Sequence, residues 1–206
     1  MNRAILMTAA AAATLSLAAC NKPATPAATD AASSAATAAN QPVNAAQDAV
    51  GAAVGQTSAT TMGSHDTGAF VSNASQSDMY EIQAGQLAST RAKNADVKAF
   101  GKMMVTAHTA MMNEMKPLVT AAHQTPADKL DQRRQGFVDN LKQATDANFD
   151  KTYIDQQVAA HQEALTLMQG YAGDGSDAGL KADAAKAVPK VQAHLDKAKS
   201  IQATLK

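Results

Sequence analysis

The chain has 206 residues, 46% of them hydrophobic and 17% charged, with 18 basic and 18 acidic side chains. This length suits one domain plus an extended segment. The balance of charge argues against a nucleic-acid partner and against binding to an anionic lipid surface, because both need an excess of Lys and Arg. Trp is absent and aromatic residues make up 3%, which argues against a surface that stacks on bases or sugars.

The first twenty residues have the pattern of an export signal. A basic start at residues 1–3 precedes an apolar run from Ala4 to Leu17, and small residues follow up to Cys20. The run is too short to cross a bilayer as a mature helix, so we expect a signal peptide over residues 1–19. Cys20 is the only cysteine, and its place directly after Leu-Ala-Ala resembles the lipidation box of bacterial lipoproteins.

This resemblance implies cleavage before Cys20, with lipid attached to the thiol and to the new amino end. The mature chain would then be held at a membrane of the bacterial cell envelope by its acyl chains, which anchor stably when there are several. Asn21 follows the cysteine, whereas aspartate there marks retention at the inner membrane in lipoproteins. We therefore expect the outer membrane, with the protein facing the periplasm.

Residues 20–65 are of low complexity. Alanine makes up 15 of the 40 residues between 21 and 60, where the only charged residues are Lys22, Asp30 and Asp48. Such a segment has too few large apolar side chains to offset the entropy lost on ordering. We predict a disordered, flexible tether over residues 20–65, with an Ala-rich helix around Asn44–Val54 as the alternative, and a folded domain over residues 66–206.

The folded part has the spacing of helices, and no stretch alternates with the period of two that strands need. The predicted elements are a helix over 75–93 capped by Ser75 or Ser77, a helix over 96–123, a shorter helix opening at Thr125-Pro126, a helix from about 146–148 to Gly173, and a helix over 177–205. Short turns between long helices place neighbours antiparallel. The predicted fold is all-α, an up-and-down four-helix bundle with an extra short helix.

Two kinds of residue inside these helices are unfavourable for helix formation. Pro117 predicts a kink or a break in the second helix, and Pro189 predicts a bend in the last one. Gly85 and Gly101 stand where better helix formers are expected, so we predict local loosening of the bundle.

Three histidines stand at core positions, one on each of three predicted helices. His108, His161 and His194 each lie on a stripe of apolar residues spaced in fours and threes. Counted from the intervening turns, Glu81 is level with His108, and the other two histidines are level within about one helical turn. A buried imidazole needs partners for both ring nitrogens, so these residues are the candidates for a site.

Three interpretations of this cluster remain open. In the first, the histidines hold the helices in register by hydrogen bonds to Glu81, Tyr80 or Tyr153. In the second, Glu81 and the three histidines bind a single Zn, Cu or Fe ion, for which bundle cores are common hosts. In the third, the cluster responds to pH, because imidazole titrates near neutral pH.

The sequence narrows the choice of metal chemistry. A carboxylate-bridged di-iron centre needs Glu three residues before His, and Val105, Val158 and Val191 stand there instead. Thioether and imidazole ligands together suit Cu(I), although methionine at helical spacing also fills cores. The methionines near His108 in the sequence are Met103, Met104, Met111, Met112 and Met115.

Several motifs of the folded part occur together in one bacterial family. They are Tyr80-Glu81-Ile82 with Leu87-Ala88, Val97-Lys98-Ala99-Phe100 leading to His108, Phe149-Asp150 with Tyr153-Ile154 and then His161, and Val188-Pro189 followed by His194-Leu195. In these motifs the chain resembles the outer-membrane or periplasmic proteins of domain of unknown function 4142. The resemblance implies a ferritin-like helical bundle whose characteristic polar positions are Glu81 and the three histidines, and it implies no activity.

The expected function is that of a lipid-anchored envelope protein of unknown ligand, a non-catalytic binding or stress-related module. No arrangement of Ser/His/Asp or Cys/His indicates a nucleophilic enzyme, so no catalytic residue is assigned, and the sequence names no protein partner. The alternative is a metal-binding or metal-handling protein that uses Glu81, His108, His161 and His194, with a single transition-metal ion as its only cofactor.

Overall fold

The computed structural model describes residues 44–60 and 65–205, and all regular structure in these two ranges is helical. The helices after residue 65 are α2 (Thr67–Arg91), α3 (Ala95–Ala121), α4 (Gln132–Gln143), α5 (Phe149–Asp174) and α6 (Ala178–Thr204). A further helical segment spans residues 44–60. The predicted all-α class is therefore confirmed. The export signal, Cys20 and the tether before residue 44 lie outside the described residues.

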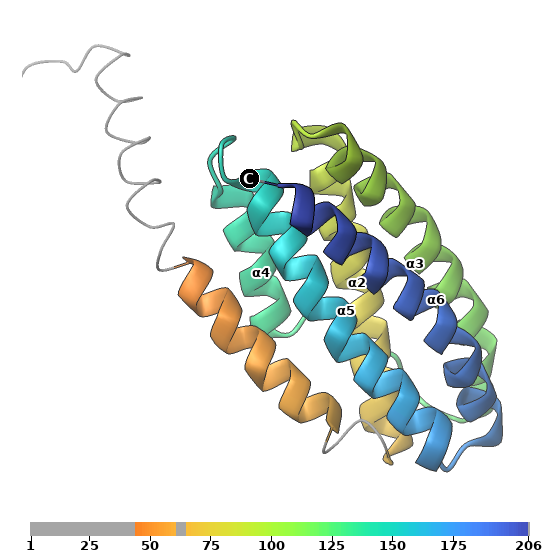
Figure 1. The fold of residues 1–206 in the computed structure, drawn as a ribbon. Coiled ribbons are helices and arrows are strands. Elements are labelled where there is room, and N and C mark those ends of the chain that lie inside the picture. The colour runs from red at the N-terminus through yellow and green to blue at the C-terminus, as the bar shows by residue number, and fades with distance from the viewer. Residues whose placement is uncertain (1–43, 61–64, 206) are drawn as a thin grey trace, which may run out of the picture.

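Two helical hairpins make up the bundle (Figure 1). The most extensive contacts join α2 to α3 and α5 to α6, the two pairs linked by short turns. Further contacts of α2 with α5 and of α3 with α6 hold the hairpins together, and α4 packs against α2 and α5. Residues from α3, α5 and α6 therefore meet inside the bundle.

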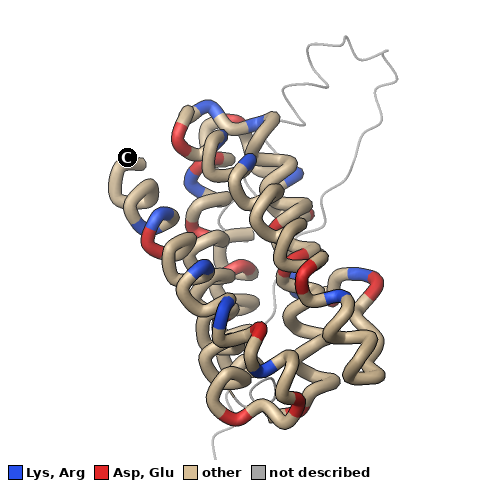
Figure 2. Tube along the Cα trace, turned by 90° about the vertical axis from the view of Figure 1, so that its right-hand side faces the viewer, with Lys and Arg blue, Asp and Glu red and all other residues tan. Residues whose placement is uncertain are grey.

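The outer surface carries charges of both signs. Basic and acidic residues are interspersed along the helices in Figure 2, and neither sign gathers on the face in view. Among the residues that the structure describes, none of the helices combines the length and the apolar character that a membrane span requires.

Side-chain caps determine where α2, α3, α4 and α6 begin. Asp66 accepts a hydrogen bond from the backbone N–H of Ala69 at 2.6 Å, which starts α2 at Thr67 rather than near Ser75 as predicted. Asp131 accepts from the backbone N–H of Arg134 at 2.7 Å and starts α4. A carboxylate that pairs with the free N–H groups of a first turn stabilises a helix by about 1 kcal/mol.

Two predicted helix starts are thus wrong. Ser75 lies buried inside α2, where its hydroxyl donates to the carbonyl of Val71 and accepts from the N–H of Ala127. The chain around Thr125-Pro126 is not helical, because its N–H groups serve contacts such as this one with α2. Apolar spacing alone could not separate this extended connection from the first turn of a helix.

The prolines and glycines inside the helices do not interrupt them. α3 continues through Pro117 and α6 through Pro189 without a break. Gly85 and Gly101 face each other where α2 packs on α3, since a Cβ on Gly85 would lie 2.7 Å from the carbonyl oxygen of Gly101. The two glycines therefore permit a close approach of the helices.

Residues 44–60 form a helix packed on α4 and α5 (orange in Figure 1), where the main prediction was a flexible tether. Asp48 accepts hydrogen bonds from Asn140 at 2.7 Å and from Gln156 at 2.6 Å. A Cβ on Gly55 would collide with the carboxylate of Glu163 on α5. Close approach of small residues and part-buried hydrogen bonds thus hold this segment in place of the large apolar side chains that it lacks. The helix around Asn44–Val54, which was the alternative prediction, is the one found.

Apolar side chains form two clusters, one toward each end of the bundle. One is built around Phe100, Phe149 and Ile154, and the other around Phe70 and Leu180. A layer of buried polar side chains on α2, α3 and α5 lies between the two clusters along these helices. Its members are Asp78, Glu81, His108 and His161.

Candidate metal centre

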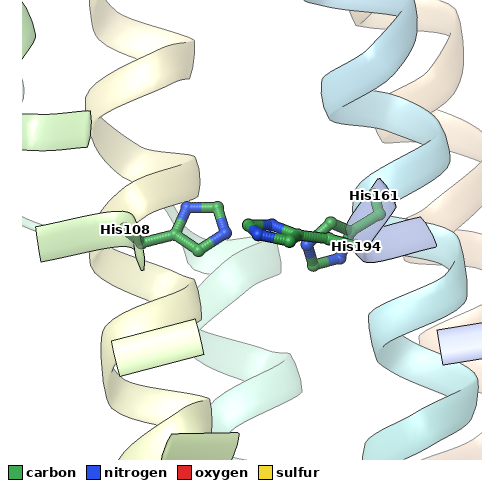
Figure 3. Close-up of side chains that lie close together, drawn as sticks. All are labelled: His108, His161 and His194. Carbon is green, nitrogen blue, oxygen red and sulfur yellow. The ribbon is translucent and has the colours of Figure 1, made fainter. Parts of the chain in front are cut away.

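The imidazole rings of His108 and His161 in this polar layer meet the ring of His194 (Figure 3). His108 comes from α3, His161 from α5 and His194 from α6, and their ring centroids are 5.5–5.6 Å apart. One ring nitrogen of each residue lies within 4.8 Å of those of the other two. The pairing of α5 with α6 sets two of the rings at one level, and the contact of α3 with α6 adds the third. The structure therefore brings together the three histidines singled out from the sequence.

The nitrogens of this cluster lack partners. His108 and His161 are 2% and 1% exposed, and His194 is half-buried. Nε2 of His108, Nε2 of His161 and Nδ1 of His194 are shielded from solvent and have no hydrogen-bond partner among the described residues. Leaving a buried polar atom unpaired costs about 1–3 kcal/mol. Three such atoms on three neighbouring rings are the donor set that a metal ion would use.

Asp78 on α2 holds the ring of His108 from the other side. Its Oδ1 lies 2.8 Å from Nδ1 of His108, and both side chains are buried. Burial alone would lower the pKa of His108, but the hydrogen bond with Asp78 and the charge of Glu81 outweigh it and raise this pKa. A carboxylate that accepts from Nδ1–H fixes the tautomer in which Nε2 is available to a metal.

The ring of His161 is held by the backbone of its own helix. Nδ1 lies 2.9 Å from the carbonyl oxygen of Gln157, and a carbonyl only accepts, so Nδ1 carries the hydrogen and Nε2 carries the lone pair. Burial, together with His108 and His194, holds the pKa of His161 well below its ordinary value. Burial and His108 also lower the pKa of His194, to about 4. Both rings are therefore neutral at pH 7, which is the form that binds metals.

Glu81 lies behind the ring of His161. Its Oε1 is 3.7 Å from Nδ1 of His161, which is beyond hydrogen-bond distance and on a different nitrogen from the unpaired Nε2. Its Oε2 has no hydrogen-bond partner within the described part of the chain. Burial raises the pKa of Glu81 to about 7. Of the four predicted ligands, the three histidines converge, and Glu81 takes an outer position.

Asp78 was missed in the sequence because its role depends on how α2 sits against α3. The available signal was its spacing: Asp78 stands three residues before Glu81, so both lie on one face of a helix. Two carboxylates on one face of a helix that packs against an interior histidine are candidate partners for the imidazole nitrogens.

The tyrosines and methionines near the cluster have other contacts. The hydroxyl of Tyr80 donates to Gln156 at 3.0 Å, and that of Tyr153 has no hydrogen-bond partner among the described residues. The hydrogen bonds from histidine to Tyr80 or Tyr153 that the structural interpretation predicted are thus not found. Met104 and Met111 belong to opposite apolar clusters, where packing accounts for them.

The geometry suits a small transition-metal ion. Zn²⁺ with three imidazoles at about 2.0–2.1 Å needs its nitrogens about 3.4 Å apart, so the rings would have to approach one another by no more than about 1.4 Å. Three protein ligands leave one coordination position of a tetrahedral ion open. His194 is the most exposed of the three rings.

One family model matches the chain, that of a domain of unknown function, DUF4142, over residues 52–201. The match takes in α2 to α5, most of α6 and part of the helix over residues 44–60, and so includes every residue of the polar layer. No curated protein and no solved structure gives a significant match. Because the family model covers well over half of its length, the chain belongs to the DUF4142 family.

Proposed function

We propose that this protein is a non-catalytic metal-binding module that holds one transition-metal ion, with Zn²⁺ as the reference case. Its ligands are Nε2 of His108, Nε2 of His161 and Nδ1 of His194. The observation that carries the proposal is that these three buried nitrogens, on rings that meet, all lack a hydrogen-bond partner among the described residues.

The energetic cost of the cluster favours binding over a purely structural role. Three unpaired buried atoms at about 1–3 kcal/mol each are a large fraction of the usual 5–15 kcal/mol of folding stability. Histidines that served only as core residues would find partners, as buried polar groups normally do. Binding of a metal ion satisfies all three nitrogens at once and offsets this cost.

The proposed setting is the bacterial envelope. The export signal and the cysteine at its end support a lipid anchor on Cys20 and the periplasmic face of the outer membrane, with the membrane as partner and no nucleic acid. The two hairpins and the family resemblance support a ferritin-like four-helix arrangement for the bundle. Mass spectrometry of the protein extracted from membranes tests the anchor, because cleavage before Cys20 and added acyl chains give a defined mass.

Metal content tests the proposed function. The chain from Asn21 onward would be produced without a histidine tag, loaded in turn with Zn²⁺, Cu²⁺ and Fe²⁺, and analysed for bound elements. We expect close to one ion per chain in the wild type and a loss of more than about 100-fold in affinity in His161→Ala. His194→Ala removes a half-buried ring and is the second variant, in case the first folds poorly.

His123→Ala is the matched control, because this histidine is exposed and outside the cluster. Its metal content should equal that of the wild type. If the wild type takes up none of the three ions, or if both site variants keep full occupancy, the cluster is not a metal site.

A further inference from the structure

Helix α2 contributes no histidine to the cluster, but it carries two buried carboxylates one turn apart. Asp78 is 6% exposed and Glu81 is 1% exposed. Asp78 lies 2.8 Å from Nδ1 of His108, and Glu81 lies 3.7 Å from Nδ1 of His161. In each of these two rings, the carboxylate therefore faces Nδ1, and the proposed metal would use Nε2.

No lysine or arginine forms an ion pair with either of these groups in the part of the chain that the structure describes. Among the described residues, their only ion pairs are those with the two histidines. The half-buried Arg133 and the buried Arg134 are bound to Glu163, and Arg134 acts on Glu81 only through its charge at longer range. A metal ion on Nε2 needs His108 in its neutral form, which leaves the two carboxylates without an ion-pair partner among the described residues. Burying charge without a counter-charge is unfavourable, so the two carboxylates favour a positive charge held by the three rings.

We propose that Asp78 and Glu81 supply the counter-charge of a doubly charged ion, and that the site therefore selects divalent metal ions over Cu(I). This inference rests on the proposed metal site. Two carboxylates balance two positive charges around three neutral rings. A singly charged ion leaves one negative charge in excess inside the protein.

The two carboxylates act in different ways. Asp78 forms a hydrogen bond with His108 and orients the ring, so its effect should extend to any ion that uses Nε2. Glu81 lies too far from His161 for a hydrogen bond, so it acts through its charge. Both are positioning residues, because the atoms that would contact the metal are nitrogens of the three histidines.

The test compares Zn²⁺ with Cu(I) in the same variants. Affinities would be measured by competition with chelators at one fixed pH, with Co²⁺ absorption bands to report whether the coordination geometry is kept. Glu81→Gln should weaken Zn²⁺ binding by about 10–100-fold and change Cu(I) binding by less than about 3-fold. Asp78→Asn should weaken both ions, because it disturbs the orientation of His108.

Glu114→Gln is the control, because this carboxylate is on the exposed surface of α3 and pairs with Lys190. It should change neither affinity. Equal weakening of both ions in Glu81→Gln, or no weakening of Zn²⁺, would overturn the selectivity while leaving the metal site in place. A wild type that binds neither ion would instead refute the proposed function.

Discussion

Two buried charged clusters in this bundle differ in whether their polar atoms have partners. In the first, Glu163 accepts from Arg133 at 2.7 and 2.8 Å and from Arg134 at 2.7 Å, so both of its oxygens are paired. In the second, the polar layer, Glu81 Oε2, His108 Nε2 and His161 Nε2 have no hydrogen-bond partner within the described residues. The two clusters are otherwise alike in being buried, charged and shared between helices.

The difference separates a structural role from a binding role. The paired cluster joins α4 to α5 and also reaches the helix over residues 44–60, where Arg133 donates to the carbonyl of Gly51 at 3.4 Å. It is complete without a ligand. The polar layer is incomplete, and groups left unpaired in a core are the ones that need a functional explanation. If burial of charge were the only criterion, both clusters would be candidate binding sites.

Breaking the paired cluster should have the largest effect on stability. Arg134→Met leaves Asp131 and part of Glu163 without their partner, and loss of one member of a buried ion pair costs about 3–5 kcal/mol. Unfolding in urea should show this loss in free energy, whereas the metal content of the folded fraction should be unchanged. Lys151→Met is the control, since its pair with Asp155 is exposed. A loss of metal together with stability would mean that the two clusters are not independent.

The polar layer should instead make the free energy of unfolding depend on pH. Burial raises the pKa of Glu81 from 4.5 to about 7, so between these values the native state holds a proton that the unfolded state has released. The free energy of unfolding contributed by this group is complete below pH 4.5. It falls as pH rises to about 7, by about 3 kcal/mol in total.

Glu81→Gln does not titrate, so this fall should be absent from the metal-free variant. Urea unfolding with a chelator at pH 5 and at pH 7.5 measures it as the difference between the two proteins. His108 titrates in both proteins, but the charge of Glu81 raises its pKa, so the difference reports the coupled pair of Glu81 and His108 rather than Glu81 alone. Parallel pH profiles would show that the carboxyl group is not held in its neutral form by burial.

The sequence was informative about faces of helices and less so about contacts between them. His108, His161 and His194 were found because each breaks an apolar stripe on its own helix. Asp78 was missed because its contact depends on the register of α2 against α3. That register is set by the close approach at Gly85, which no single-helix pattern contains.

The helix over residues 44–60 was predicted only as an alternative, for a related physical reason. Its composition gives little apolar surface of its own, and its stability comes from docking on α4 and α5. Gly55 permits that docking by leaving room for the carboxylate of Glu163. A prediction based on the pattern of apolar side chains does not detect a position such as Gly55, where the absence of a side chain permits packing.

Gly55→Ala should therefore have the smallest of the three effects on stability and the most local one. The added methyl group would collide with Glu163 at the edge of the paired cluster, and overpacking of this kind costs about 1–3 kcal/mol. Hydrogen exchange should show residues 44–60 losing protection while α5 and the polar layer keep theirs. Gly136→Ala is the matched control, because a Cβ there meets nothing within 4 Å, and in a helix it should stabilise by about 0.5–1 kcal/mol. If Gly55→Ala also loosens His161, the paired cluster supports the polar layer as well as the outer helix, and the separation of the two regions fails.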